Sequence, residues 1–314
     1  MNPLISIIIP VYNIASKIKP CIHSILQQSC QEFEIIVVDD GSNDGSGNIC
    51  DEFQNLKNIQ IIHQPNSGVT AARQKGIENA HGEWICFVDG DDTLPTDSLQ
   101  VLIDNSHNVD IVVGNVIPIT PTGEMLKKES VSEAMLLSST DFIKKLLEHK
   151  IGTYPGGRLF KRSLFDHFTL DLPRNIRRGE DFIMNIRLAA KAKQIRVISN
   201  HVYNYIQYPD SSLHRFVNSW NYEKVFDKHL MESLQNAHLQ HTCKESIIHA
   251  HIRSLLGGLT DPELSRQDSF FKQIKKEAKE VALSKKEKAI LFLAGIPFPI
   301  RKRLYVILKK LSVR

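Results

Sequence analysis

Residues 33–42 of this chain read FEIIVVDDGS. A run of β-branched and aromatic residues predicts a strand that is buried on both faces, as strands of a parallel sheet are. The run ends in two carboxylates, a glycine and a serine. The same pattern recurs in LISIIIPVYN (4–13), where Pro10 is expected to end the strand, and in WICFVDGDD (84–92). Three buried strands that each end in polar groups predict an α/β fold.

Helical signals lie between these strands. Apolar residues recur at helical spacing over about 15–28, and similar patterns cover 44–56 and 67–80, while 59–64 reads as a shorter strand. Strands that alternate with helices predict a doubly wound, mostly parallel sheet flanked by helices. Ligands bind such sheets beyond the carboxyl ends of the strands. The polar strand ends are therefore expected to line one crevice.

The remainder of the chain predicts more of this domain and then a helical region. The further elements are strands at 110–120 and 195–208 and helices at 139–149 and 179–193. From about Val217 the pattern is helical to the last residue. We therefore expect a catalytic domain at 1–216 and a helical C-terminal region at 217–314.

Composition limits the class of protein. The 314 residues are 42% hydrophobic and 24% charged, which are ordinary globular values. The five cysteines are odd in number and lack C-x-x-C spacing, which argues against a disulfide framework or a zinc site. No signal peptide is recognisable before the first strand, and no segment reaches the roughly 20 apolar residues that span a bilayer. We expect a cytoplasmic protein.

The basic character of the chain is concentrated at its end. Residues 285–314 carry nine Lys or Arg against Glu287, a local charge of +8, so the rest sums to −4 within the total of +4. Apolar residues share one helical face there: Ile300, Leu304, Ile307, Leu308 and Leu311. This tail is typical of a helix lying on an anionic membrane, on the inner face of the cell membrane. Packing on the catalytic domain or in a homodimer is an equal alternative. No motif supports nucleic-acid binding.

Asp39 and Asp40 are the first candidate binding residues. A carboxylate at the end of a buried strand can accept a hydrogen bond from an imide N–H, such as N3 of uracil. Asp, Gly and Ser are equally common in turns and helix caps, and a turn is the simpler interpretation of the pair alone. Their expected position in the crevice favours a binding role.

Asp89, Asp91 and Asp92 form the second candidate group. Like charges this close repel, and their desolvation is costly, so the cluster requires a counter-ion. Mg²⁺ and Mn²⁺ prefer oxygen ligands, and Mg²⁺ often takes one or two carboxylates together with phosphate oxygens. A solvated acidic turn is the alternative. The position after a buried apolar strand favours a metal site.

Three further groups complete the candidates. Arg73, in the helix at 67–80, could hold a base or a phosphate, or could face solvent. Glu180 and Asp181 open a helix, where the helix dipole alone would favour them, but a carboxylate there could also act as a general base. A polar loop after the strand at 195–208 could bind phosphate or metal; it contains Ser211, Ser212, His214 and Arg215.

Taken in this order, these segments resemble family 2 glycosyltransferases with the GT-A fold. The resemblance covers roughly residues 4–215. It is carried by ISIIIPVYN, FEIIVVDDGSNDGS, NSGVTAARQKGIENAHGEWICFVDGDD, GRLFKRSLF and RRGEDFIMNIRLAAKA. It implies an enzyme that transfers a hexosyl or N-acetylhexosaminyl group from a nucleotide-diphosphate sugar, often a UDP-sugar, with inversion and with Mn²⁺ or Mg²⁺. The acceptor would be a hydroxyl of a glycan or a lipid-linked glycan, in surface polysaccharide or lipooligosaccharide synthesis.

The resemblance also implies roles for single residues. Asp181 would be the catalytic base, and Glu180 would orient it or the acceptor. The metal would be held by Asp91 with Asp89 and Asp92, and His214 could assist. The nucleotide-sugar pocket would be lined by Pro10, Tyr12, Asn13, Asp39, Asp40, Arg73, Asp89, Gly90 and Ser212.

The chain departs from the family pattern at two places. Gln74 follows the helix arginine, where the family often has Asn. Ile206 and Gln207 stand where many members carry a basic residue that holds the diphosphate. Two alternative functions remain: a nucleotidyltransferase, which would favour a Gly-rich, lysine-bearing loop after the first strand, and a catalytically silent nucleotide-sugar-binding or scaffold protein.

Overall fold

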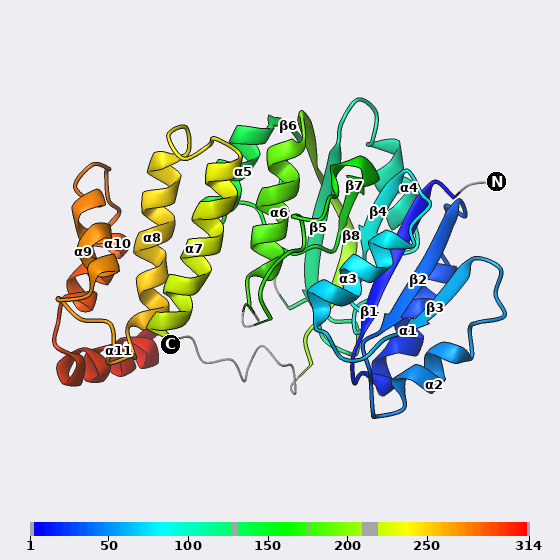
Figure 1. The fold of residues 1–314 in the computed structure, drawn as a ribbon, viewed down its shortest axis with the longest axis horizontal. Coiled ribbons are helices and arrows are strands. Elements are labelled where there is room, and N and C mark those ends of the chain that lie inside the picture. Colours follow the sequence, from blue (N-terminus) through cyan, green and yellow to red (C-terminus); the bar gives the residue numbers. More distant parts are fainter. Residues whose placement is uncertain (1–2, 127–130, 175, 177, 209–218, 313–314) are drawn as a thin grey trace. The chain divides into compact units, whose positions relative to one another are not determined.

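The computed structural model describes residues 3–126, 131–174, 176, 178–208 and 219–312. The chain forms two compact units, Met1–Phe142 with Ile151–Ser211, and Ile143–Lys150 with Ser212–Arg314 (Figure 1). The described part of the first unit contains an eight-stranded sheet, and the second is helical. The second unit also includes the segment at 143–150, which lies within the catalytic domain expected from sequence.

The sheet of the first unit confirms the expected α/β architecture. Its strands are β1 (Ile5–Val11), β2 (Phe33–Asp39), β3 (Ile59–His63), β4 (Trp84–Phe87), β5 (Ile111–Ile119), β6 (Met135–Ser138), β7 (Arg158–Lys161) and β8 (Gln194–Ile206). Their order is β3-β2-β1-β4-β7-β5-β8-β6. The first four of these are parallel neighbours, β7 is antiparallel to β4 and β5, β8 is parallel to β5, and β6 is antiparallel to β8. Strands β6 and β7, of four residues each, are additions to the expected set.

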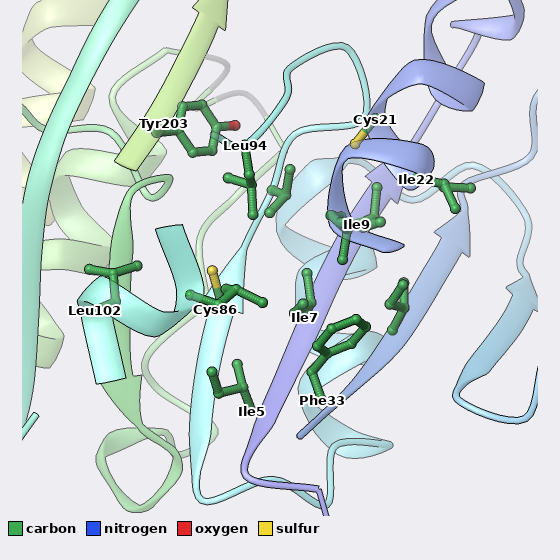
Figure 2. Packing of buried hydrophobic residues seen from close by; sticks show 14 of the residues in the cluster. Ile5, Ile7, Ile9, Cys21, Ile22, Phe33, Cys86, Leu94, Leu102 and Tyr203 are labelled. Carbon is green, nitrogen blue, oxygen red and sulfur yellow. The ribbon is translucent and has the colours of Figure 1, made fainter. Parts of the chain in front are cut away.

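Helices cover both faces of this sheet. They are α1 (Ala15–Leu26), α2 (Ser46–Asp51), α3 (Val69–Glu78), α4 (Ser98–Asp104) and α6 (Glu180–Lys191), with a 3-10 turn at Arg162–Leu164. Helix α5 (Ser139–Leu147) belongs from Ile143 on to the second unit. Figure 2 shows Ile5, Ile7 and Ile9 following one another along β1, in the buried cluster that also includes the inner face of α1. On the opposite face, Gly76 of α3 packs so closely on Ile8 that a Cβ would lie 2.4 Å from its Cγ2. Both faces of β1 are thus buried, as its β-branched run predicts.

The expectation that Pro10 ends the first strand is wrong. Pro10 lies inside β1, opposite Val38 of β2, and the strand continues to Val11. The pairing of β1 with β4 stops at Ile8, whose carbonyl accepts the N–H of Val88. The backbone N–H of residue 10 would face the same neighbouring strand, β4, as the backbone of residue 8. Because the pairing with β4 has already ended at Ile8, Pro10 removes no hydrogen bond from the sheet.

The second unit is a set of helices: α7 (Trp220–Asn236), α8 (Lys244–Gly258), α9 (Ser269–Glu277), α10 (Lys285–Ala294) and α11 (Phe298–Ser312). Its core contains Trp220, Ile252, Phe271 and Ile290. The structure therefore confirms a helical C-terminal region. No described helix is both long enough and apolar enough to cross a membrane.

Arg301 does not share the exposed basic character expected of the tail. The side chain is 1% exposed. Its guanidinium donates to the carbonyls of Leu259, Ala294, Ile296 and Asp261. These carbonyl groups lie at the C-terminal ends of α8 and α10 and in the turns that follow them. Arg301 therefore fixes the start of α11 to the core of the unit. The side chains of Ile307, Leu308 and Leu311 lie outside the described residues.

Candidate active site

The carboxyl ends of β1, β2 and β4 lie at one edge of the sheet, as the parallel register requires. Gly90, after β4, lies against the loop after β1: a Cβ on it would be 2.5 Å from Ile14 Cδ1 and 3.2 Å from the carbonyl of Pro10. The DGDD turn and the PVYN segment are therefore adjacent. Tyr12, at the end of β1, is half exposed.

Asp40 is buried and organises the loop between β3 and α3. Its Oδ1 accepts from Gln64 Nε2 at 2.7 Å and from the N–H of Ser67 at 2.8 Å. Its Oδ2 accepts from the N–H of Gly68 at 2.7 Å. Gly68 has a φ of +92°, a conformation that glycine adopts without strain. The carboxylate thus fixes the start of the helix that carries Arg73.

Asp39 links the carboxyl end of β2 to that of β3. Its Oδ1 accepts from the N–H of Ser42 at 3.1 Å, and its Oδ2 lies 2.9 Å from His63 Nδ1. The other nitrogen of His63 lies 3.0 Å from Asp51 Oδ1. These two hydrogen bonds raise the pKa of His63. Both buried carboxylates of the DDGS motif therefore have hydrogen-bond partners within the protein.

Asn13 joins the first two loops of the crevice. It has a positive φ of 52°, and its Oδ1 accepts the N–H of Asn43 at 2.9 Å. Asp44 reinforces the junction: Oδ2 accepts the N–H of Ala15 at 2.9 Å, and Oδ1 accepts from the hydroxyl of Ser46 at 2.6 Å. The side chain of Asn13 is therefore engaged in loop geometry.

The DGDD turn is fixed to the end of β8 by Tyr203. The buried hydroxyl of Tyr203 accepts the N–H of Asp89 at 3.0 Å and donates to Asp92 Oδ2 at 2.8 Å. Asp92 Oδ1 accepts the N–H of Ile206 at 2.8 Å. Burial, together with Asp89 and Asp91, raises the pKa of Asp92. Since both of its oxygens are bonded within the protein and it is 2% exposed, Asp92 is built as a support for the turn.

Arg73 connects the DGDD turn with the start of α6. Its guanidinium is 3% exposed and donates to Asp89 Oδ1 at 2.9 Å and to Asp181 Oδ1 at 2.5 Å. Burial alone would lower the pKa of Arg73, but Asp181 and Asp89 raise it on balance, so the side chain stays charged. Arg73 and Asp181 are 108 residues apart in sequence. The fold thus brings the predicted base and the first predicted metal carboxylate onto one cation.

Glu180 and Asp181 form an acidic pair at the first turn of α6. Burial raises the pKa of Asp181 to about 7, against the opposing effect of Arg73, and it also raises the pKa of Glu180. Glu180 Oε2 and Arg73 Nε are buried without hydrogen-bond partners in the described part of the chain. The Asp181 side chain remains 25% exposed, so solvent or a substrate hydroxyl can reach it.

A divalent cation fits the chemistry of this site. Asp89, with a side chain 36% exposed, and the half-buried Asp91 offer carboxylate oxygens, which Mg²⁺ and Mn²⁺ prefer. Among the described residues, no three His, Cys, Asp or Glu side chains are grouped as a metal centre. One or two carboxylates completed by diphosphate oxygens would suffice for Mg²⁺. Ser212 and His214, expected to contribute, lie outside the described residues.

Sequence reasoning did not identify Tyr203 or Asn185 as residues of the site. The Tyr203 hydroxyl links two turn residues more than 110 positions away, and Asn185 Nδ2 donates to the carbonyl of Asp181 at 2.8 Å. The ring of Tyr203 packs on Gly156, where a Cβ would lie 2.4 Å from it, but this contact joins distant parts of the sequence and leaves no local signal. Nothing in the local sequence around Asn185 marks its role.

Comparison with known proteins shows the family of the chain. Residues 6–169 match glycosyl transferase family 2. The uncharacterized glycosyltransferase EpsJ of Bacillus subtilis is 31% identical over 241 residues, which are 75% of this chain and 69% of EpsJ. A poly(ribitol-phosphate) beta-glucosyltransferase of Bacillus spizizenii is 30% identical over 209 residues, 64% of this chain but 32% of that protein.

The fold also matches a solved structure. The crystal structure of S. aureus TarS 1–349 in complex with UDP-GlcNAc aligns with a TM-score of 0.62 at 20% identity, and covers 96% of this chain and 91% of that one. The α/β unit with its carboxylates at the strand ends is thus a GT-A glycosyltransferase domain. The chain belongs to glycosyl transferase family 2 and is a glycosyltransferase.

Proposed function

We propose that the chain is an inverting, metal-dependent glycosyltransferase that moves a sugar from a UDP-sugar to a hydroxyl of a glycan or lipid-linked glycan. The observation that carries the proposal is the shared guanidinium of Arg73, which brings the carboxylates of Asp89 and Asp181 together. The complex of TarS with UDP-GlcNAc supports a UDP-sugar as donor. The similarity to a poly(ribitol-phosphate) beta-glucosyltransferase supports cell-surface polymer synthesis.

The roles of the carboxylates follow from their environments. Asp91, with Asp89, would hold Mg²⁺ or Mn²⁺, and the bound ion would neutralise charge on the diphosphate leaving group. Asp181 takes the proton of the acceptor hydroxyl, whose oxygen forms a bond to C1 as the bond from C1 to the phosphate oxygen breaks and UDP leaves. A raised pKa suits this role, because it makes the carboxylate a stronger base. Glu180 lies beside it to orient the acceptor.

The structure suggests changed roles for three residues expected to touch the donor or the metal. Arg73, expected at the base or diphosphate, is proposed as the group that positions Asp89 and Asp181. Asp92 is proposed as the anchor of the turn, since Tyr203 and Ile206 occupy both of its oxygens. Asp40 is proposed to set the position of α3, and Tyr12, half exposed at the strand end, is the better candidate for contact with the nucleobase.

The test of this function is a donor screen. Purified protein is incubated with a panel of nucleotide sugars and Mn²⁺ or Mg²⁺, and release of the nucleotide is measured with and without EDTA. We expect UDP release that stops when EDTA removes the metal ion. We also expect Asp181→Asn to lose the part of UDP release that depends on an added acceptor. A chain that binds UDP but releases none from any donor would be a silent binding protein.

We also propose peripheral association with an anionic membrane through the C-terminal helices. On α10, Lys285, Lys288 and Phe292 are exposed at helical spacing, and Phe292 is 70% exposed. The start of α11 exposes Ile300, which is 55% exposed, and Lys302. Exposed apolar side chains among lysines favour a surface of anionic lipid. A lipid-linked acceptor in the same membrane would then lie close to the enzyme.

A further inference from the structure

Two tyrosines stand together near the candidate active site without a role in the chemistry above. Tyr154 lies in the loop between α5 and β7, and Tyr205 lies near the end of β8. Their ring centroids are 5.8 Å apart, with an angle of 31° between the ring planes. Tyr154 is 48% exposed although it is large and aromatic. An aromatic pair with one ring exposed and the other half-buried offers an apolar surface to a ligand.

The loop of Tyr154 is attached to the predicted base. Asn185 Nδ2, one helical turn after Asp181, donates both to the carbonyl of Thr153 at 3.0 Å and to the carbonyl of Asp181 at 2.8 Å. Arg158, 2% exposed, donates to Asn185 Oδ1 at 2.5 Å and also to the carbonyl of Gly152. A single amide group therefore fixes the backbone before Tyr154 and the backbone of the base relative to each other.

Tyr205 is attached to the predicted metal carboxylates. The residues on either side of it in β8 hold the DGDD turn: Asn204 exchanges backbone hydrogen bonds with Thr93, and the N–H of Ile206 donates to Asp92. The tyrosine pair thus connects the residues that hold Asp181 with the residues that hold the DGDD turn. The buried Asn185 and Asp92 thus fix the backbone beside each tyrosine, and a backbone fixed before the ligand arrives lowers the entropic cost of binding.

We propose that Tyr154 and Tyr205 form a stacking platform for a sugar ring of the acceptor, so that the acceptor is a cyclic saccharide and not an acyclic polyol phosphate. This inference rests on the proposed function. The C–H groups on one face of a pyranose are apolar and pack on the negative face of an aromatic ring. The acceptor hydroxyl that attacks C1 must reach Asp181 to lose its proton, and Asn185 bonds both the backbone of Asp181 and that of Thr153, next to Tyr154. An acyclic polyol phosphate presents no such face.

The experiment separates the acceptor side from the donor side. The variants are Tyr154→Leu, which keeps apolar bulk without a ring, and Tyr154→Trp, which restores one. Leu136→Ala, at an exposed residue of β6, is the control for surface change. The probes are methyl glycosides of glucose, galactose and N-acetylglucosamine, together with a ribitol phosphate oligomer. For each variant we measure acceptor KM, UDP affinity, slow hydrolysis of the donor by water, and saturation-transfer NMR from protein to each probe.

The platform predicts a specific pattern. Tyr154→Leu raises the KM of the best methyl glycoside about tenfold or more, the effect of roughly one lost stacking contact. Its UDP affinity and donor hydrolysis stay at the wild-type level, and Tyr154→Trp returns the KM to within about threefold. Saturation transfer to the glycoside falls in Tyr154→Leu and persists in Leu136→Ala.

Two results would overturn the platform. One is a glycoside KM and NMR signal that are the same in Tyr154→Leu and wild type. The other is transfer to ribitol phosphate with none to any glycoside. Failure of the proposed function looks different, because the wild type would then neither bind UDP nor hydrolyse any donor. The difference in saturation transfer to the glycoside between the wild type and Tyr154→Leu would still decide the platform in that case.

Discussion

Arg73 is the residue on which the geometry of the active site depends most. Its buried guanidinium neutralises Asp89 and Asp181, which belong to segments far apart in sequence. We predict that Arg73→Gln lowers kcat by at least about 100-fold and destabilises the protein by about 3–5 kcal/mol, because two carboxylates lose their buried counter-charge. Activity assays and urea denaturation measure both effects. The exposed Lys75→Gln on the same helix is the control, and an equal response of the two variants would contradict the role.

At the residue scale, the sequence shows where the candidate carboxylates lie in the elements but not what they bond to. Asp39, Asp40, Asp89 and Asp181 are identifiable because each follows or opens a regular element. What they bond to depends on residues distant in sequence, as in the bonds of Asp40 to Gln64 and of Asp39 to His63. Side-chain partners of this kind have no local pattern, so a turn support and a ligand contact look alike in the sequence.

At the scale of elements, β8 decides the position of the DGDD turn. We predict that Tyr203→Phe lowers the free energy of unfolding by about 1–3 kcal/mol, since Asp92 loses a buried donor and the N–H of Asp89 an acceptor. The same change should weaken Mn²⁺-dependent UDP binding, measured by calorimetry. Tyr305→Phe in the second unit is the matched loss of a hydroxyl. Unchanged UDP binding in Tyr203→Phe would show that the DGDD turn keeps its conformation without the Tyr203 hydroxyl.

Helices α7, α8 and α9 are joined by a buried charged histidine. His251 is 3% exposed, with Nε2 at 2.9 Å from Asp227 Oδ1 and Nδ1 at 2.7 Å from Glu277 Oε2. Burial would lower the pKa of His251, but the two carboxylates beside it, Asp227 and Glu277, raise it to about 9. A raised histidine pKa gives stability that is complete below about pH 6.5 and is lost as pH rises through the folded pKa.

We therefore predict that the second unit loses up to about 3 kcal/mol of stability between pH 6.5 and pH 10. Trp220 lies in this unit and reports on it once Trp84→Phe removes the fluorescence of the first. His251→Gln should flatten the pH dependence, whereas the exposed His241→Gln should leave it. Identical slopes in both variants would contradict the charged histidine.

The hydrophobic patterns predicted the elements well because burial imposes a period on the sequence. The continuous runs of β1 and β2 and the helical spacing of α1 and α6 each report a buried face. The short strands β6 and β7 carry too few residues for a period. Pro10 misled because a missing N–H matters only where a neighbouring strand is present, and that depends on sheet order.

At the scale of the whole molecule, the C-terminal helices tie the enzyme to a membrane in our proposal. Truncation before α10 is not a usable test, because Ile290 and Arg301 belong to the core of the unit. We predict instead that Phe292→Ser with Lys288→Glu reduces binding to phosphatidylglycerol-containing vesicles by about tenfold or more, since it removes both apolar and electrostatic attraction. Co-sedimentation measures this, with the exposed Lys57→Glu as control. Equal sedimentation of the wild type, the double variant and Lys57→Glu would contradict membrane association.

The most direct test of the central claim compares two carboxylate variants in one assay. UDP binding with and without Mn²⁺ is measured by calorimetry, and UDP release from the best donor is measured beside it. We predict that Asp91→Asn loses the Mn²⁺-dependent part of UDP binding. Asp181→Asn should retain that binding and lose transfer to the acceptor. Mn²⁺-dependent binding and full transfer in both variants would contradict a single crevice in which cation, sugar nucleotide and base meet.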